Sequence, residues 1–319
     1  MYWLFQTLFI PTPDQIFIIL MKASVFLFAI FALLGLASCV KDSTDITLES
    51  DPKLVVECYL NPSDSVIVAT VSSSRALTGE GSGDRSNVSA LTTATVTLSD
   101  GSKTVTLTNA SSSNSYKIAA TAFPILSGHT YTLSVAASGL PTASASCTIP
   151  ASLTALQTQG TTITSELTSN SVYTFYAQKT LSWDTPENSS TNYFLVGSGY
   201  GSTCKRLVNE QLTTVVDLSE TQVVAFLSDG NTSSHTYTTA QLSLPIGQGC
   251  SNELSSMKAE GKVYAFAYKV DYNYYEFFRT VKLQRESGDN PFAEAASVYT
   301  NIQNGLGVFA AYTTIATPL

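Results

Sequence analysis

Apolar and polar side chains alternate along short segments through most of this 319-residue chain. In residues 54–60, Leu-Val-Val-Glu-Cys-Tyr-Leu, the first, third, fifth and seventh side chains are apolar and would share one face of an extended strand. A period of two is typical of a β-strand that is buried on one side. Val, Thr and Tyr are abundant and only 13% of the residues are charged, which favours a mostly β, secreted-type protein.

Residues 53–150 contain about seven such segments, the number expected of an immunoglobulin-like β-sandwich. The expected strands are residues 54–60, 66–71, 94–98, 104–107, 116–118, 130–135 and 143–149. Ser99-Asp100-Gly101 is typical of a hairpin turn. The Ser- and Gly-rich residues 72–89 predict a mobile loop.

Residues 151–319 predict a second β-sandwich, and this one resembles the fibronectin type III fold. Residues 180–184, Thr-Leu-Ser-Trp-Asp, look like its second strand, with Trp183 as the core tryptophan, and residues 192–196 look like the third. Further strands are expected at residues 215–227, 262–269 and 306–312, and a loop at residues 228–239.

The segment 272–286 differs from its surroundings. Tyr274, Phe278 and Val281 recur at helical spacing, and neither Gly nor Pro interrupts the segment. This pattern predicts one amphipathic helix packed on the sheet.

The N-terminus has the pattern of a secretory signal. Met21-Lys22 gives a basic start, residues 23–35 are apolar, and Leu-Ala-Ser leads into Cys39. The run is shorter than the roughly 20 residues of a membrane span. Leu-Ala-Ser-Cys resembles the bacterial lipobox, so we expect Cys39 to be lipidated and residues 1–38 to be removed; the alternative is a buried cysteine in a hydrophobic helix.

Residues 1–20 do not suit a signal helix, because Pro11, Pro13 and Asp14 would interrupt it. We therefore expect translation to start at Met21, with an unusually long leader as the alternative.

Residues 39–52 are expected to be a tether. No aspartate follows Cys39, and Lys41-Asp42 resembles the export signal of Bacteroidota surface lipoproteins. This favours a lipid-anchored protein of the outer membrane, displayed on its outer face; the alternative for Lys41-Asp42 is a solvated tether.

The charge excludes some partners. Removal of 38 residues leaves 319 − 38 = 281, and since those 38 hold one Lys and one Asp, the net charge stays at −8. An acidic chain is a poor ligand for nucleic acid, whose phosphates are bound by clustered Lys and Arg. It also adsorbs poorly on anionic lipid, so the acyl chains on Cys39 must attach it to the membrane.

Four cysteines follow Cys39, and three pairings of them are conceivable in an oxidising compartment. A Cys204–Cys250 disulfide would close a loop of 250 − 204 = 46 residues and contribute about 4 kcal/mol, and we favour it over two free thiols. Cys58 and Cys147 point inward on the first and last expected strands of the first sandwich. A disulfide between them and a pair of small buried side chains both fit this placement.

Several segments, together with the lipobox, resemble one known family. They are residues 54–57, 94–98 and 128–133, Asn-Pro-Phe at 290–292, and Tyr-Thr-Asn-Ile-Gln-Asn-Gly-Leu-Gly-Val-Phe at 299–309. They are similar to the Bacteroidota outer-membrane lipoproteins known as domain of unknown function 4249, although Cys58 stands where the pattern would have glycine. The resemblance implies an accessory role in nutrient capture or receptor assembly, because members tend to be encoded beside TonB-dependent receptors. The family has no established activity.

Two further positions resemble modification sites of the same phylum. Asp42-Ser43-Thr44 and Asp64-Ser65-Val66 resemble its O-glycosylation sequon, and Ser43, in the tether, is the better candidate.

No motif in the sequence indicates catalysis. The two histidines, His129 and His235, have no partner at metal-ligand spacing, and Asp229-Gly230-Asn231 reads as a turn rather than a calcium loop. We therefore expect no enzymatic activity, no metal and no cofactor. Candidates for stacking on a ligand are Tyr193, Tyr200, Tyr237, Tyr272 and Tyr275, although most tyrosines on a β-sandwich are half-buried in its sheets.

The preferred hypothesis is a non-catalytic binding or scaffold module that is anchored in the outer membrane and docks on a TonB-dependent receptor in nutrient uptake. The alternatives are an envelope hydrolase acting on glycan or peptide, whose residues converge only in space, and a structural, adhesin-like protein.

Overall fold

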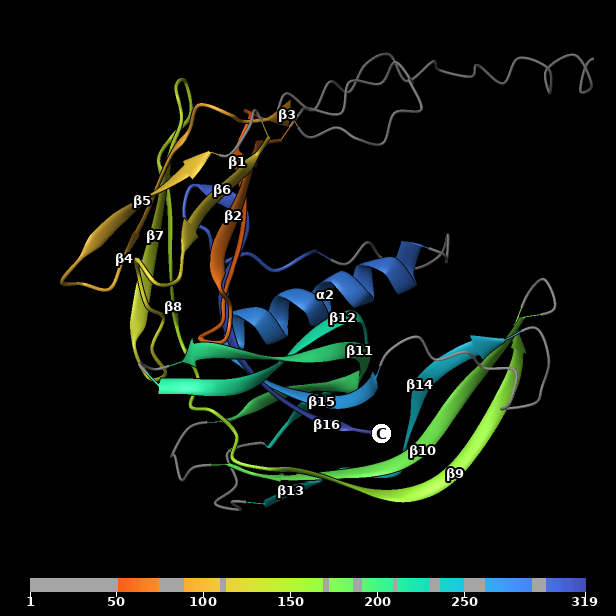
Figure 1. Cartoon of the computed structure of the whole chain (residues 1–319). Helices are drawn as coiled ribbons and strands as arrows, with labels where there is room; N and C mark the ends of the chain where they lie inside the picture. The colour runs from red at the N-terminus through yellow and green to blue at the C-terminus, as the bar shows by residue number, and fades with distance from the viewer. Residues whose placement is uncertain are drawn as a thin grey trace, which may run out of the picture. The chain divides into compact units, whose positions relative to one another are not determined.

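The described part of the chain is mostly β with one helix, as the sequence predicts (Figure 1). The computed structural model describes residues 51–74, 89–109, 113–168, 172–185, 191–208, 211–229, 236–249, 262–288 and 297–319. In chain order the elements are β1 (Leu54–Leu60), β2 (Val66–Ser73), β3 (Ser89–Ala90), β4 (Thr95–Ser99), β5 (Thr104–Asn109), β6 (Ser115–Ala119), β7 (Thr130–Ala136), β8 (Ala143–Thr148), β9 (Leu156–Thr168), β10 (Val172–Asp184), β11 (Tyr193–Val208), β12 (Gln211–Ser228), β13 (Thr236–Thr238), β14 (Leu242–Gly249), β15 (Lys262–Val270), α2 (Tyr272–Gly288) and β16 (Gly305–Pro318).

The first β region encloses a continuous apolar core. The order β16-β1-β2-β6-β5-β4-β7-β8 places β5 between two groups of strands, because β5 pairs with both β6 and β4. Side chains from both groups meet in one core, in which Leu54, Val56, Cys58 and Leu60 of β1 are all buried. The alternation of residues 54–60 therefore predicted both the strand and its buried face correctly.

The second β region packs β11 and β15 against β10 and β14. Its core centres on Trp183 of β10, which is 2% exposed and makes ring contacts with Phe194 and Tyr237. The role expected of this tryptophan is confirmed. The segment 228–239, expected to be a loop, contains the short strand β13, which pairs with the end of β10. Backbone pairing at a sheet edge leaves little trace in the side-chain pattern, so the sequence missed β13.

Strand β16 belongs to both regions. Its first half pairs in parallel with β1, from Leu54↔Gly305 to Leu60↔Ala311, and its second half pairs antiparallel with β15. Phe309 of β16 lies in the first core. The strand beside β1 is therefore β16 and not β8, and the first region is completed by the end of the chain rather than by residues 53–150 alone.

Helix α2 covers the face of the sheet that points away from both cores. Tyr274 and Phe278 on the helix contact Tyr59 of β1, and Tyr274 also contacts Tyr312 of β16. The helix predicted at residues 272–286 is confirmed. Among the described residues, no helix is both long and apolar enough to cross a membrane.

Asp271 begins helix α2 and ties it to β16. Its Oδ1 accepts hydrogen bonds from the backbone N–H of Tyr274 at 2.9 Å, as an N-cap residue does, and from that of Ala311 at 3.3 Å. The Asn273 amide donates to its other oxygen at 3.0 Å. Burial raises the pKa of Asp271 to about 6, and these hydrogen bonds only partly offset that effect.

The joint between β1 and β16 requires a glycine at position 307. Gly307 has a φ of +100°, and a Cβ there would lie 2.1 Å from the carbonyl oxygen of Val56. Gly139 also has a positive φ, of +77°, but a Cβ there would meet nothing within 4 Å. A side chain at position 139 would therefore introduce backbone strain alone, whereas a side chain at position 307 would introduce both backbone strain and a steric collision.

We expect Gly307→Ala to lower the free energy of unfolding by roughly 3 kcal/mol, because left-handed strain and overpacking act together. Gly139→Ala, which meets only the strain, should cost about 1 kcal/mol. Urea unfolding followed by far-UV circular dichroism measures both variants, and equal losses would refute the collision at the joint.

We expect the Asp271 carboxyl to make stability fall as pH rises. Its pKa in the folded protein, about 6, is above its ordinary value of 3.8, so its contribution is complete below pH 3.8 and is lost as pH rises through 6. Asp271→Asn retains an N-cap oxygen without the charge, and should remove a loss of about 3 kcal/mol between these limits. Unfolding free energies at pH 4 and pH 7 test this expectation.

Asp100→Asn is the control for this pH series. Asp100 is half-exposed in the β4–β5 turn, where hydrogen bonds from Lys103 and Ser102 lower the pKa of its carboxyl. Its contribution is therefore lost as pH falls, so the two substitutions should change the pH dependence in opposite directions. A change of the same sign in both variants would contradict the assignment.

Candidate functional site

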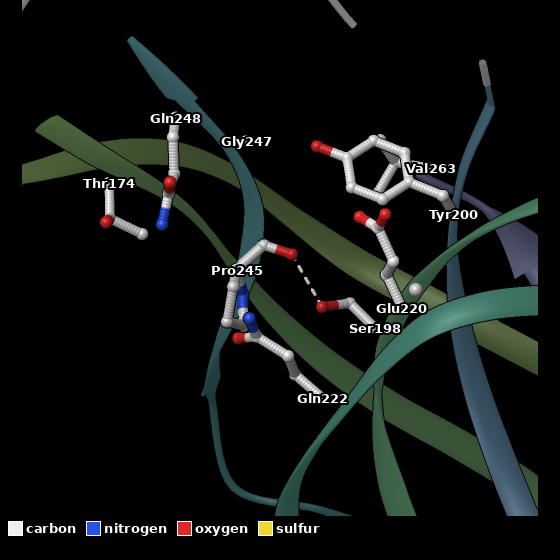
Figure 2. A pocket seen from close by; sticks show the side chains of 10 residues that line it. Thr174, Ser198, Tyr200, Glu220, Gln222, Pro245, Gly247, Gln248 and Val263 are labelled. Carbon is white, nitrogen blue, oxygen red and sulfur yellow. Dashed lines mark hydrogen bonds between the residues drawn. The ribbon is translucent and has the colours of Figure 1, made fainter. Parts of the chain in front are cut away.

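A polar pocket lies between the two sheets of the second β region (Figure 2). Its volume is about 320 Å³. Tyr200 and Glu220 enter it from β11 and β12, and Thr174 and Gln248 face them from β10 and β14. The size is at the lower end of the range for small-molecule sites, about 300–1,000 Å³.

Alternating glycines in β11 shape one side of this site. A Cβ on Gly197 would lie 1.9 Å from the carbonyl oxygen of Gln222, and one on Gly201 would lie 2.8 Å from that of Asp217. Strand β12 therefore passes so close to this face of β11 that only glycine fits. The pairing of β11 with β12 also shifts register at Val196/Gly197 and at Ser198/Tyr200, as it does at β-bulges.

The intervening residues Ser198 and Tyr200 point to the opposite face. The Ser198 hydroxyl donates a hydrogen bond to the carbonyl oxygen of Pro245 at 2.5 Å, and the Tyr200 hydroxyl donates to that of Ile246 at 3.5 Å. Both acceptors belong to β14. The Gly-Ser-Gly-Tyr-Gly sequence at 197–201 thus gives β11 one bare face for β12 and one hydroxyl-bearing face for the pocket.

Glu220 has an unfavourable backbone conformation at the edge of this pocket. Its φ is +48°, in the left-handed region that side chains other than glycine rarely occupy. Such strain costs of order 1–2 kcal/mol and is concentrated at functional sites. A glycine would relieve it, so a carboxylate at this position carries a cost in stability.

Three of the five tyrosines expected to stack on a ligand form one group, in which Tyr193 contacts the other two. Tyr193 of β11 lies 5.6 Å from Tyr272 and 4.8 Å from Tyr275 of α2, between ring centroids. Tyr237 stacks on Trp183 in the second core, at 4.8 Å. Of the five, only Tyr200 lines the pocket.

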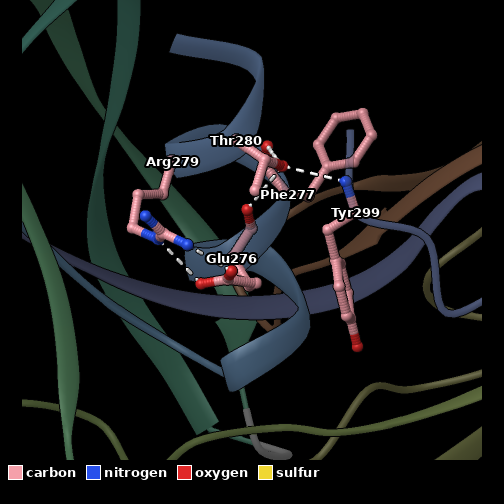
Figure 3. A network of polar contacts seen from close by, with 5 residues as sticks. All are labelled: Glu276, Phe277, Arg279, Thr280 and Tyr299. Carbon is pink, nitrogen blue, oxygen red and sulfur yellow. Dashed lines mark hydrogen bonds and ion pairs between the residues drawn. The ribbon is translucent and has the colours of Figure 1, made fainter. Parts of the chain in front are cut away.

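The polar groups of α2 hold the chain segment that precedes β16 (Figure 3). The Thr280 hydroxyl donates to helix carbonyls of Glu276 and Phe277 and accepts the backbone N–H of Tyr299 at 2.9 Å. The Tyr299 hydroxyl donates to the Asn273 side chain at 2.9 Å. The Arg279 guanidinium beside Glu276 lowers the pKa of that carboxyl. These contacts support structure rather than chemistry.

The C-terminal family motif at 299–309 is also structural. The Asn301 side chain donates to the carbonyl oxygen of Phe309 at 2.7 Å and accepts its N–H at 3.0 Å, as a paired strand would. Asn304, with a φ of +59°, donates to the carbonyl oxygen of Thr142 at 3.2 Å. Gln303 forms an isolated β-bridge with Ser144. The motif therefore attaches the start of β16 to the start of β8.

The Cys58–Cys147 disulfide that the sequence allowed is not formed. Both side chains are buried thiols in the first core, and burial raises the pKa of Cys58 to about 12 and that of Cys147 well above its ordinary value. The alternative of two small buried side chains is correct here. The disulfide was inferred from β1 and β8 being neighbours, whereas β1 pairs with β2 and β16.

The thiol of Cys204 donates to the Asp217 carboxylate at 3.3 Å. Its favoured partner, Cys250, lies outside the described residues, so that disulfide stays a prediction.

Cys39, Ser43 and His235 also lie outside the described residues. Ser65 is exposed in the turn between β1 and β2, where a glycan could attach, and its modification stays a prediction. His129 directly precedes β7, as expected of a turn residue. Within the described ranges, no three His, Cys, Asp or Glu side chains are placed to hold a metal ion.

Lys269 is the buried amine of the second region. It is 3% exposed, burial lowers its pKa, and its Nζ has no hydrogen-bond partner among the residues that the structure describes. The Thr313 hydroxyl also has no hydrogen-bond partner among the described residues, and Thr313, on β16, pairs in register with Lys269. Neither residue is among the described residues lining the pocket, so the two do not extend the site.

Sequence motifs alone did not reveal this pocket. Its described polar side chains come from four strands, β10, β11, β12 and β14. No recognised sequence motif links these strands. The one local signal is the alternation of glycine with hydroxyl residues at 197–201.

Comparison with known proteins assigns the chain to a family. No curated protein matches it significantly. The model of the family described as Domain of unknown function (DUF4249) matches residues 41–316, which include every described element except the last two residues of β16. The chain therefore belongs to this family, the one that its N-terminal strand and its C-terminal motif already resemble.

Proposed function

We propose that this protein is a lipid-anchored outer-membrane lipoprotein that acts, without catalysis, as a binding module beside a TonB-dependent receptor in nutrient uptake. The observation that carries the binding role is the polar pocket with Glu220 in a strained conformation at its edge. A carboxylate that lowers stability at a cavity is better explained by a ligand than by packing.

The composition of the pocket favours binding over hydrolysis. Glycoside hydrolysis ordinarily requires two carboxyl groups on either side of the scissile bond. Among its described lining residues, Glu220 is the one carboxylate, and no histidine accompanies it. A receptor-docked binding module therefore remains the preferred hypothesis over the envelope hydrolase, and the pocket gives it more support than it gives a purely structural adhesin.

The anchor supports a partner in the same membrane. Eleven residues, 40–50, separate Cys39 from the first described residue. Fully extended, they reach at most roughly 40 Å. Acyl chains on Cys39 would therefore hold the protein at the membrane in which such a receptor lies.

We expect Cys39→Ala to abolish labelling by a radioactive fatty acid and to remove the protein from the outer-membrane fraction, because the acidic chain has little affinity of its own for lipid. Cys204→Ala replaces a cysteine that lies far along the chain from the signal; it is the control for loss of a cysteine as such, and should stay in the membrane even if the predicted disulfide is lost with it. Normal fractionation of Cys39→Ala would refute the anchor.

We expect the native protein, cross-linked in intact cells and isolated through a C-terminal tag, to be recovered with a β-barrel of the TonB-dependent receptor class. Mass spectrometry identifies the partner. The Cys39→Ala variant should lose it, since the tether no longer concentrates the two proteins in one membrane. A hydrolase would instead release products from envelope polysaccharide or peptide in the absence of any receptor, and such turnover would overturn the proposal.

A further inference from the structure

The charge of the pocket limits its ligand. Glu220 carries a negative charge, and no lysine or arginine is found among the described lining residues. An anionic ligand would therefore be repelled. Glu220 is exposed, so water already solvates its carboxylate and it needs no cationic partner. The pocket thus suits an uncharged ligand.

The polar groups of the pocket are of mixed kind. The Gln222 and Gln248 amides each offer donors and an acceptor, and the Glu220 carboxylate accepts two hydrogen bonds. The Ser198 and Tyr200 hydroxyls donate to β14, which leaves their oxygen lone pairs to accept from a ligand. Neighbouring hydroxyls of a polyol each donate and accept, and so match such an array.

Tyr200 adds an apolar surface. Its ring lies beside the Glu220 carboxylate, and both face the Gln248 side chain across the pocket (Figure 2). An aromatic ring next to hydrogen-bonding groups suits a ligand that has an apolar C–H face and a polar rim, as a pyranose ring does. The volume of about 320 Å³ suits a ligand of this size better than a long chain.

From these features we infer that the pocket binds a neutral carbohydrate, one or two sugar rings in size, with Glu220 and the two glutamines bonded to its hydroxyls and Tyr200 against its ring. The inference rests on the proposed function as a binding module and names the ligand class of its site. It also explains Glu220: the left-handed backbone aims a carboxylate into the cavity, which glycine could not do.

The test is calorimetric titration of the full-length lipoprotein with neutral sugars. The probes are glucose, galactose, mannose, xylose, N-acetylglucosamine, maltose and cellobiose. The detergent must have a polyether head group, because glucoside and maltoside detergents would compete. We expect saturable binding of at least one probe, and a roughly 10- to 100-fold weaker affinity in Glu220→Gln, since a hydrogen bond to a charged group is lost.

Glu286→Gln is the matched control. It removes the same charge from an exposed position near the end of α2, away from the pocket, and should bind as the wild type does. Glu220→Gly removes the carboxylate but relieves the backbone, so its Tm should rise while its sugar affinity falls. That combination separates loss of binding from loss of folding.

The remaining outcomes decide against the inference. No saturable binding by any probe, or unchanged affinity in Glu220→Gln, would overturn it. Binding of spermidine or of glucose 6-phosphate in place of neutral sugars would show that the ligand class is wrong. Membrane fractionation and receptor recovery of Glu220→Gln should equal those of the wild type. Loss of the receptor with sugar binding intact would therefore count against the proposed function and not against this site.

Discussion

The parallel pairing of β1 with β16 is the constraint on which the rest of the structure depends. Its first pair, Leu54↔Gly305, joins residues that are 305 − 54 = 251 positions apart. Parallel strands cannot be joined by a hairpin, so the chain that follows β1 must form other elements before it returns as β16. Phe309 and Ala311 complete the first core, the same strand continues into the sheet of the second region, and α2 packs over the joint. Because Phe309 and Ala311 belong to the first core, that core is complete only when the C-terminal strand is in place.

The C-terminal family motif and the candidate site lie in different parts of the structure. Asn301, Asn304 and Gly307 serve the joint, through side-chain hydrogen bonds and through a close approach that only glycine permits. The pocket residues lie on β10, β11, β12, β14 and β15, outside the short motifs that first indicated the family, although the family model spans them. The family motif therefore indicates how the strands are held together, whereas the ligand has to be inferred from the pocket itself.

The same sheet combines a strained backbone with the polar side chains of the pocket. On one face of β11, Gly197 and Gly201 let β12 approach; on the other, Ser198 and Tyr200 face β14. The bulges that result hold Glu220 in a left-handed conformation at the cavity. Removing the side chain would stabilise the fold and leave the cavity without its charge. Such a trade between stability and a functional group is expected where a protein binds a ligand.

The sequence by itself determined the local elements: the strand and buried face at residues 54–60, the helix at 272–286 and the core position of Trp183, because periodicity and residue size act over short distances. It also identified the family, whose motifs are contiguous. Only the tertiary structure decided that β16 rather than β8 lies beside β1, that Cys58 and Cys147 stay thiols, and that Thr174, Tyr200, Glu220 and Gln248 share one cavity. These relations depend on which distant strands pair and on where bulges place a side chain. The residue pattern along one strand carries no information about either.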